Sequence, residues 1–251
     1  LETKNLSEKA INNILKDLDP HSTFIPSNQR IRLNESLVGH FGGIGIRFMI
    51  YNDTLTVVDV IDNGPSKAAD IKKRDRIISI DKENVAGINL KTEDFLKKLK
   101  WIIGSPVKLT ILKPNKTIVS KTIIRGAIPL KSVPAFTMLN NEIGYIKISS
   151  FSNTTDLEFK AALQDIVNKG AKNLVLDLRF NGGGYLHQAI NIVDEFLNKN
   201  QLIVYTEGAH SQKRSFYATN QGLFKDGKLI ILVNSSTASA SEIVSGAIQD
   251  N

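Results

Sequence analysis

A segment rich in small hydroxylated residues near the end of the chain could carry a nucleophile. The run KLIILVNSSTASASEIVSGAIQD, residues 228–250, predicts a buried strand, a turn of small residues and then a helix. A side chain at such a turn is lifted out of the sheet beside a helix N-terminus, where free amides and the dipole favour developing negative charge. Ser239 is then a candidate nucleophile, although the GxSxG pattern is absent. The alternative is structural: Ser239 or Ser241 caps the helix and Glu242 lies in its first turn.

Consecutive glycines form a second candidate site. The motif DLRFNGGG, residues 177–184, follows NLVLDLR, a nearly continuous apolar run that predicts a strand buried on both faces. Backbone amides in such a loop, at Gly182 and Gly183, could approach a ligand closely and hold a phosphate or an oxyanion. Neither GxxxxGK[ST] nor GxGxxG is present, so the motif gives little support to nucleotide binding. A flexible turn before a helix is the alternative.

A third glycine motif, GGIGI at residues 42–46, begins a predicted strand. Successive amides in this loop could bind a terminal carboxylate, and the strand could pair with a peptide by β-augmentation. The candidate peptide-binding residues are Gly43, Ile44, Gly45 and Ile46. A predicted helix over 91–102 could form the other wall of the groove, with Phe95, Leu96 and Leu99 facing inward. The alternative is a tight turn or a bulge.

Composition excludes several classes of protein. The chain has 251 residues, 41% hydrophobic and 23% charged, which is typical of a soluble globular protein. The absence of cysteine excludes disulfides and thiolate chemistry, and four scattered histidines without HExxH spacing predict no metal site. The charge of +7 is spread without interleaved aromatic residues, which favours a solvated basic surface over nucleic-acid binding. No apolar run is long enough to span a bilayer.

Predicted elements group into three parts. Residues 1–37 form an N-terminal helical segment, with a helix over 6–18 that Asp19-Pro20 ends. Residues 38–113 form a small β-rich module with two helices. Residues 114–251 alternate strands and helices, which predicts an α/β core. The strands of that core are expected at 143–149, 173–179, 202–205 and 228–234, and its helices at 155–169, 185–198 and 239–249.

Four of these segments together resemble the carboxy-terminal processing peptidases, serine–lysine proteases of family S41 with a PDZ domain. LDPHSTFIP is similar to the family's segment before the PDZ domain, and GIGI with NGPSKAADIKKRDRIISID is similar to its PDZ core. DLRFNGGG resembles its glycine motif, and TASASEIVSGAIQDN resembles its nucleophile motif. The segments occur in family order and cover nearly the whole chain. The resemblance implies a PDZ-like module and a crotonase/ClpP-like α/β protease core.

The resemblance also implies roles and partners. Ser239 matches the nucleophile, and Ser241 is its chief rival. The amides of Ala240 with Gly182 or Gly183 match the oxyanion donors, and Glu242 matches a position that helps to orient the lysine. The implied substrates are proteins or peptides with free C-terminal tails, in the bacterial periplasm or cell envelope. No cofactor, metal or nucleic acid is implied, there is no integral membrane segment, and a homo-oligomer is an open possibility.

Two departures from the family pattern qualify this interpretation. The family's base is a lysine about two dozen residues beyond the nucleophile, and no lysine follows Ser239 here. We therefore expect a truncated sequence that alone hydrolyses nothing; the alternative is a non-catalytic, peptide-binding pseudo-protease. A crotonase-like enzyme acting on thioesters is a third hypothesis, but it gives the PDZ-like module no role. Asp70 and Arg74 replace the family's glycines, so we expect a reshaped turn there.

Overall fold

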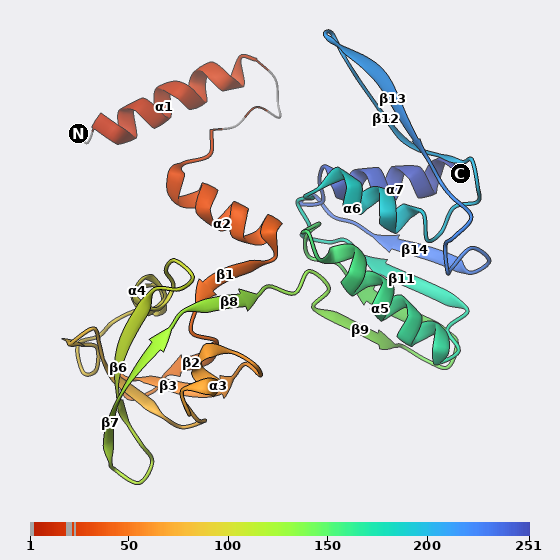
Figure 1. Ribbon diagram of the computed structural model, residues 1–251. Coiled ribbons are helices and arrows are strands. Elements are labelled where there is room, and N and C mark those ends of the chain that lie inside the picture. Colours follow the sequence, from red (N-terminus) through yellow and green to blue (C-terminus); the bar gives the residue numbers. More distant parts are fainter. Residues whose placement is uncertain (1–2, 19–21, 23) are drawn as a thin grey trace. The chain divides into compact units, whose positions relative to one another are not determined.

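The computed structural model describes residues 3–18, 22 and 24–251 (Figure 1). The predicted helix stop at Asp19-Pro20, and with it part of LDPHSTFIP, lies outside the described residues. The chain divides into two compact units, one made of residues up to 39 together with 131–251 and the other of residues 40–130. Among the described residues, no helix is both long and apolar enough to cross a membrane.

The unit of residues 40–130 is built on an antiparallel sheet with the order β2-β3-β4-β6-β7, and β5 pairs with β4. These strands are β2 (Ile46–Ile50), β3 (Leu55–Val60), β4 (Arg76–Ile80), β5 (Glu83–Asn84), β6 (Pro106–Leu112) and β7 (Ile118–Ile124). A separate pair joins β1 (His40–Gly43) to β8 (Gly126–Pro129). Val107, Leu109 and Ile111 alternate along β6 and are fully buried, as expected for a strand with one face on a core.

This unit extends past residue 113, where the sequence analysis placed its end. The pairing of β6 with β7 runs from Pro106–Ile124 to Leu112–Ile118, so a boundary at 113 falls in the turn of a hairpin. β7 therefore belongs to the sheet of this unit.

The two helices of the unit are α3 (Pro65–Ala68) and α4 (Thr92–Leu99). Because Phe95 and Leu99 are four residues apart they share one helix face, and both are buried. The prediction that Leu96 also faces inward is wrong, because its side chain is rotated off that face and is exposed. The helix also ends three residues earlier than expected.

The turn at Asp70 and Arg74 has two residues in the left-handed region. Their φ angles are 59° and 70°, in the region that favours glycine. The Arg74 N–H donates to Val57 O (2.8 Å), and the Lys113 Nζ donates to Asp70 O (3.2 Å). These hydrogen bonds hold the left-handed conformation that glycine would adopt more readily.

The other unit contains a four-stranded sheet with the order β14-β11-β10-β9. Its strands are β9 (Ala135–Met138), β10 (Ile143–Lys147), β11 (Asn173–Asp177) and β14 (Lys228–Leu232). β10, β11 and β14 are parallel, and β9 is antiparallel to β10. The helices of this unit are α1 (Thr3–Lys16), α2 (Ser27–Val38), α5 (Thr155–Asn168), α6 (Leu186–Val193) and α7 (Ala240–Asp250). The predicted α/β core is confirmed, although α6 is shorter than expected.

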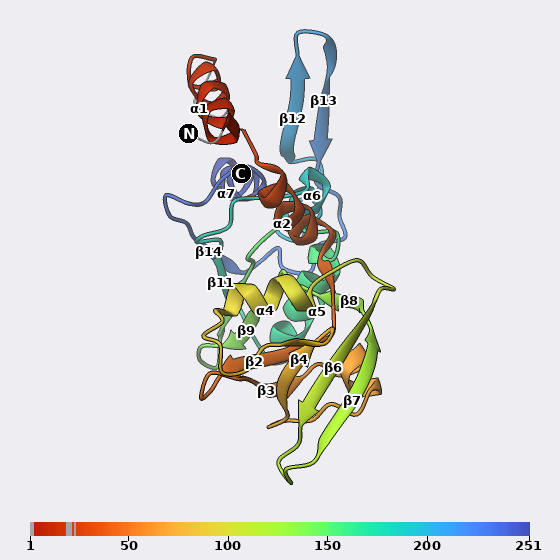
Figure 2. The same cartoon turned by 90° about the vertical axis from the view of Figure 1, so that its left-hand side faces the viewer.

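Strand position explains the remaining differences. β11 lies inside the sheet, and its Leu174 and Leu176 are buried. β14 was predicted as a buried strand but is an edge strand, with β11 as its neighbour and Ile230 58% exposed. The expected strand at 202–205 is part of a longer hairpin of β12 (Leu202–Gly208) and β13 (Ser211–Tyr217), which extends as a two-stranded arm in Figure 2. Neither β13 nor the short β8 and β9 was predicted.

Candidate active site

Ser239 lies at the predicted junction of strand, turn and helix. It is exposed and is the N-cap of α7, with φ 58° and ψ −119°. A non-glycine residue rarely adopts this positive φ, and such strain gathers at functional sites because the surrounding structure must impose it. Here Thr237 helps to impose it: its Oγ1 donates to Leu178 O (3.0 Å) and accepts from Asn234 N–H (2.9 Å).

Glu242 holds the backbone of Ser239. Its carboxylate accepts the Ser239 N–H at 2.6 Å, from the third position of α7. An acidic side chain in the first turn also interacts favourably with the helix dipole. The predicted site residue Glu242 is therefore beside Ser239, in the first turn of the helix where the structural alternative placed it.

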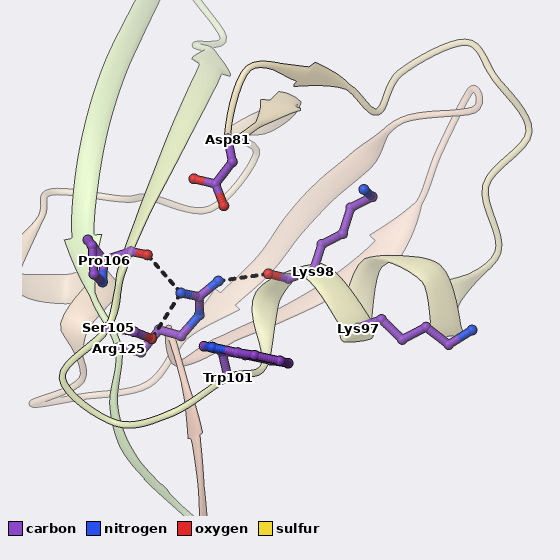
Figure 3. A pocket seen from close by; sticks show the side chains of 7 residues that line it. All are labelled: Asp81, Lys97, Lys98, Trp101, Ser105, Pro106 and Arg125. Atoms are coloured by element: carbon purple, nitrogen blue, oxygen red, sulfur yellow. Dashed lines mark hydrogen bonds between the residues drawn. The ribbon is translucent and has the colours of Figure 1, made fainter. Parts of the chain in front are cut away.

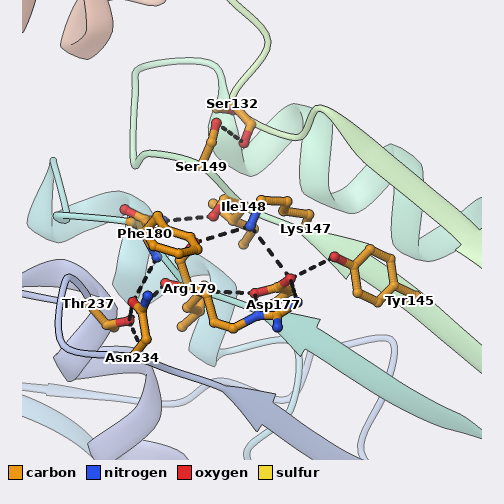
Figure 4. A network of polar contacts seen from close by, with 12 residues as sticks. Ser132, Tyr145, Lys147, Ile148, Ser149, Asp177, Arg179, Phe180, Asn234 and Thr237 are labelled. Carbon is orange, nitrogen blue, oxygen red and sulfur yellow. Dashed lines mark hydrogen bonds and ion pairs between the residues drawn. The ribbon is translucent and has the colours of Figure 1, made fainter.

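The glycine loop lies next to this turn because of the strand order. β11 and β14 are parallel neighbours with Asp177 opposite Leu232, so the loops that follow them leave the same edge of the sheet. The Phe180 N–H donates to Asn234 Oδ1 (2.9 Å) and links the two loops directly (Figure 4). The structure thus brings together the two motifs that the sequence analysis singled out in this unit.

Asn181 is a residue that the sequence analysis missed. Its buried side chain donates from Nδ2 to Ile148 O (3.1 Å) and accepts at Oδ1 from Gly183 N–H (2.9 Å). Its carbonyl oxygen accepts from Ala238 N–H (3.2 Å) and from Ser241 Oγ (3.0 Å). One asparagine therefore positions the end of a strand, the glycine loop and the nucleophile turn. An asparagine immediately before a glycine run was the available signal.

Gly183 permits the close approach of the two loops. A Cβ added there would lie 2.8 Å from Ser239 Cβ and 2.9 Å from both Ala238 O and Ala240 N, and its φ is +99°. Two of those three atoms are backbone and cannot rotate away. Gly182 differs, because a Cβ there would meet nothing within 4 Å. Position 183 therefore requires glycine because any larger side chain would collide with the neighbouring turn.

The hydrogen bonds distinguish the candidate oxyanion donors. The Gly183 N–H is already donated to Asn181 Oδ1. The Ala240 N–H is at the first position of α7, where helix geometry supplies no intrahelical acceptor. The Gly182 N–H likewise has no acceptor among the described residues. Ala240 and Gly182 are thus the candidate donors whose N–H groups have no acceptor among the described residues.

The two candidate serines have different environments. Ser241 is fully buried and donates its Oγ proton to Asn181 O. Ser239 is exposed on the same turn. A substrate carbonyl could reach Ser239 without disturbing the core, so the geometry favours Ser239 over its rival.

A charged network supports the base of the glycine loop (Figure 4). The almost fully buried Asp177 accepts from Arg179 Nε (3.0 Å) and Nη2 (2.8 Å) and from Tyr145 OH (2.7 Å), and Lys147 Nζ lies 3.5 Å away. The hydrogen bonds from Arg179, assisted by Tyr145, hold the pKa of Asp177 well below its usual range. The same carboxylate raises the pKa of Arg179, and burial together with Asp177 raises the pKa of Tyr145.

Replacing Asp177 with asparagine is expected to destabilise the protein in a pH-dependent way. Near neutral pH the loss in free energy of unfolding should be about 2 kcal/mol, at the low end for a buried pair because Arg179 is 48% exposed. A carboxylate with a depressed folded-state pKa stabilises above its unfolded pKa, about 4, and loses that contribution as pH falls further. Urea unfolding at pH 7 and pH 3 measures the free energy of unfolding of the parent and of the Asp177→Asn variant. If the difference between these two free energies were the same at both pH values, the prediction would be contradicted.

The predicted peptide-binding loop is in the other unit. Gly43 ends β1, Ile44 is buried, and Gly45 has φ +75° and accepts Ile61 N–H at its carbonyl (3.0 Å). Ile46 begins β2, which is at the end of the sheet order and so offers an unpaired edge.

Aromatic side chains connect β2 with α4. Phe48 packs against the core, and the Phe95 ring meets it edge-on with centroids 6.0 Å apart. A chain added beside β2 would therefore lie along an apolar wall.

Comparisons with known proteins agree with this architecture. Residues 142–251 match peptidase family S41, and residues 42–123 match the PDZ domain. The carboxy-terminal-processing protease of Bartonella bacilliformis is 36% identical over 100% of this chain and 58% of its own length. The carboxy-terminal processing protease CtpA of Bacillus subtilis is 33% identical over 98% of this chain and 52% of its own. A solved photosystem II D1 C-terminal processing protease, 23% identical with a TM-score of 0.49, aligns over 99% of this chain and 68% of that one.

A PDZ domain combined with an α/β peptidase core is the class of protein that the fold and these matches define. Within that class, residues 142–251 belong to peptidase family S41 and residues 42–123 to the PDZ domain family. It spans 58% and 52% of the length of the two curated relatives.

Proposed function

We propose that the full-length polypeptide is a serine endopeptidase with Ser239 as its nucleophile. The observation that carries the proposal is the exposed, strained Ser239 held against Gly183, with the Ala240 and Gly182 N–H groups free of acceptors among the described residues. Its Oγ would bond to a peptide carbonyl carbon while the carbonyl π electrons move to oxygen. Collapse of that tetrahedral intermediate would break the C–N bond, release the amine and leave an acyl-enzyme for water to hydrolyse.

The proposed oxyanion site consists of the Ala240 and Gly182 N–H groups. The Gly182 N–H belongs to the glycine loop, and the Ala240 N–H begins α7 and adds the positive end of the helix dipole. Donors that are already oriented stabilise the transition state without reorganising during the reaction. Metal ions and cofactors have no part in this scheme.

The Ser239 proton must pass to a base, because a serine hydroxyl is too weakly acidic to ionise unaided. The resemblance implies a neutral lysine whose pKa burial has lowered. No lysine follows Ser239 in the printed sequence. The experiments on activity are therefore designed for the full-length polypeptide.

We further propose that the PDZ domain binds the free C-terminal tail of the substrate. The tail would add to the unpaired edge of β2, and its carboxylate would accept hydrogen bonds from the loop of Gly43–Ile46. An apolar last residue would lie against Phe48 and Phe95. The bacterial envelope, which the resemblance implies, is the proposed location of this reaction.

The tail proposal predicts a dependence on the terminal carboxylate. A peptide with an apolar free C-terminus should bind the protein at least about tenfold more tightly than the same peptide with an amidated C-terminus, since charge-assisted hydrogen bonds are lost. Fluorescence anisotropy of an N-terminally labelled pair measures both affinities. Equal affinities would refute carboxylate recognition and would leave the assignment of Ser239 untouched.

A further inference from the structure

Three consecutive large apolar side chains are exposed directly after α4 in the PDZ domain. Trp101 is 64% exposed, Ile102 70% and Ile103 48%. Single exposed apolar residues are normal on a protein surface, whereas a contiguous group marks an interaction site. The sequence pattern predicts a helix that includes Trp101 and Ile102. The structure instead ends α4 at Leu99 and presents them in a turn.

Backbone hydrogen bonds hold this turn, which we call the Trp101–Ile103 turn, in place. The Trp101 N–H donates to Gly42 O (3.1 Å). Gly104, the residue after Ile103, has φ +87° and donates its N–H to Arg125 O (2.8 Å). The Arg125 N–H donates to Ser105 O (2.9 Å). The apolar side chains are therefore presented by a preorganised loop, which lowers the entropic cost of binding.

A basic pocket lies beside the turn (Figure 3). Its volume is about 350 Å³, and Trp101 and Ser105 form part of its wall. The charged residues that line it are Lys97, Lys98, Arg125 and Asp81. Three positive charges against one negative charge leave a net charge of +2. The pocket therefore suits an anion, and it shares Trp101 with the apolar turn.

Arg125 gives the pocket a fixed positive charge. The residue is 5% exposed, and its guanidinium donates to Leu99 O, Lys98 O and Pro106 O at 2.8–2.9 Å and to Ser105 Oγ at 3.1 Å. These acceptors are neutral, so they orient the guanidinium, and Asp81 is the carboxylate of the pocket that interacts with its charge. Four of its five N–H donors are used in this way, and one remains for a ligand.

The charge around the turn is distributed unevenly along α4. The last turn of the helix carries Lys97 and Lys98, whereas Glu93 and Asp94 occupy the first turn, away from the exposed apolar residues. Lys98 forms an ion pair with the exposed Glu83, and Lys97 lies 3.9 Å from Asp94. Both pairs are solvent-exposed and weak enough for an anionic surface to compete with them.

We propose that the Trp101–Ile103 turn and its basic pocket bind the surface of an anionic phospholipid membrane. Ile102 and Ile103 would enter the acyl boundary, and Trp101 would lie at the headgroup level that tryptophan favours. A headgroup phosphate would occupy the pocket and contact Arg125. The apolar residues favour a lipid phosphate over a free one, because a soluble anion gives them no role. This proposal is independent of the proposed peptidase reaction.

The protein contains a single tryptophan, so its fluorescence reports directly on this turn. Vesicles of phosphatidylcholine mixed with phosphatidylglycerol should shift Trp101 emission to the blue, and brominated acyl chains should quench it. Vesicles of phosphatidylcholine alone should do neither at physiological ionic strength, since the basic residues add attraction only to anionic lipid. The full chain is used throughout.

Matched variants separate the two components of the site. The double substitution Ile102→Ser and Ile103→Ser should weaken sedimentation with anionic vesicles at least about tenfold. Lys97→Ala with Lys98→Ala should weaken it several-fold and reduce its dependence on salt. The controls are Ile118→Ser, a residue 64% exposed on β7, and Lys72→Ala with Lys73→Ala, two exposed lysines of the same domain. Neither control should alter binding, and circular dichroism checks that each variant folds.

Four outcomes would overturn the proposal. The first is unchanged Trp101 emission with anionic vesicles. The second is equal vesicle binding by the Ile102/Ile103 variant and the parent. The third is saturable binding of inorganic phosphate without vesicle binding, which would make the pocket a soluble-anion site. The fourth is a blue-shifted emission that grows with protein concentration in the absence of lipid, which would make a second copy of the chain the occupant.

Discussion

Substituting Ser239 with alanine in the full-length polypeptide is expected to lower kcat for cleavage of a tail-bearing peptide by at least about 10⁴-fold, the scale of losses when a serine nucleophile is removed. KM should change little, because the proposed tail-binding residues are in the PDZ domain. The fold should also persist, since Ser239 is exposed and its backbone contact with Glu242 remains. Initial rates on a fluorogenic peptide, with unfolding curves beside them, measure all three quantities.

Ser241→Ala is the matched control for this prediction. The Ser241 Oγ is buried and donates to Asn181 O, so its removal should cost about 1 kcal/mol in free energy of unfolding. Activity should stay within about tenfold of the parent, because the nucleophile and its neighbouring amides are untouched. If Ser241→Ala were inactive and Ser239→Ala active, the assignment would be reversed. If neither changed the rate, hydrolysis would use another residue, and the assignment of Ser239 would be wrong.

Local patterns in the sequence were sufficient to predict most of this site. A strand, small residues and a helix predicted the turn at Ser239, and a buried strand before glycines predicted the loop at Gly182 and Gly183. Both predictions rest on neighbours in sequence, which fix backbone geometry over a few residues. The resemblance to a known family was needed to give these residues chemical roles.

What the sequence could not predict depends on contacts between distant segments. The order β14-β11-β10-β9 places the two loops side by side and also makes β14 an edge strand. An apolar sequence such as KLIIL does not show whether the strand lies at the edge or in the interior of a sheet. The role of Asn181 has the same origin, because its partners Ile148 and Ser241 are remote in the chain. The error at Leu96 had a different cause. The helical spacing was predicted correctly, but the buried face of the helix is narrower than expected and does not include Leu96.

The structure also shows why the capping alternative and the nucleophile interpretation are compatible. Glu242 caps α7 through the Ser239 N–H, which leaves the Ser239 side chain on the exposed side of the turn. The cap helps to maintain an unfavourable φ of 58° at Ser239. A helix cap is thus part of what would hold a nucleophile in place.

Substituting Gly183 with alanine is the second prediction with a large expected effect. The new Cβ would lie within 2.9 Å of Ala238 O and Ala240 N, and alanine would have to adopt φ +99°. Overpacking and left-handed strain together should cost about 2–5 kcal/mol in free energy of unfolding. Relief of the clash would move the glycine loop away from Ser239, and with it the Gly182 N–H of the proposed oxyanion site. We therefore expect kcat to fall at least about 100-fold even where the variant remains folded.

Gly246→Ala separates this local effect from a general sensitivity of glycine positions. Gly246 is inside α7, and an added Cβ there would meet nothing within 4 Å. Alanine in a helix interior should raise the free energy of unfolding by about 0.5–1 kcal/mol and leave the rate unchanged. Thermal unfolding and initial rates of both variants, measured well below their midpoints, test the pair. A folded Gly183→Ala protein with the parent's kcat would show that the closeness of the two loops is dispensable. It would also remove the geometric basis for pairing Gly182 with Ala240.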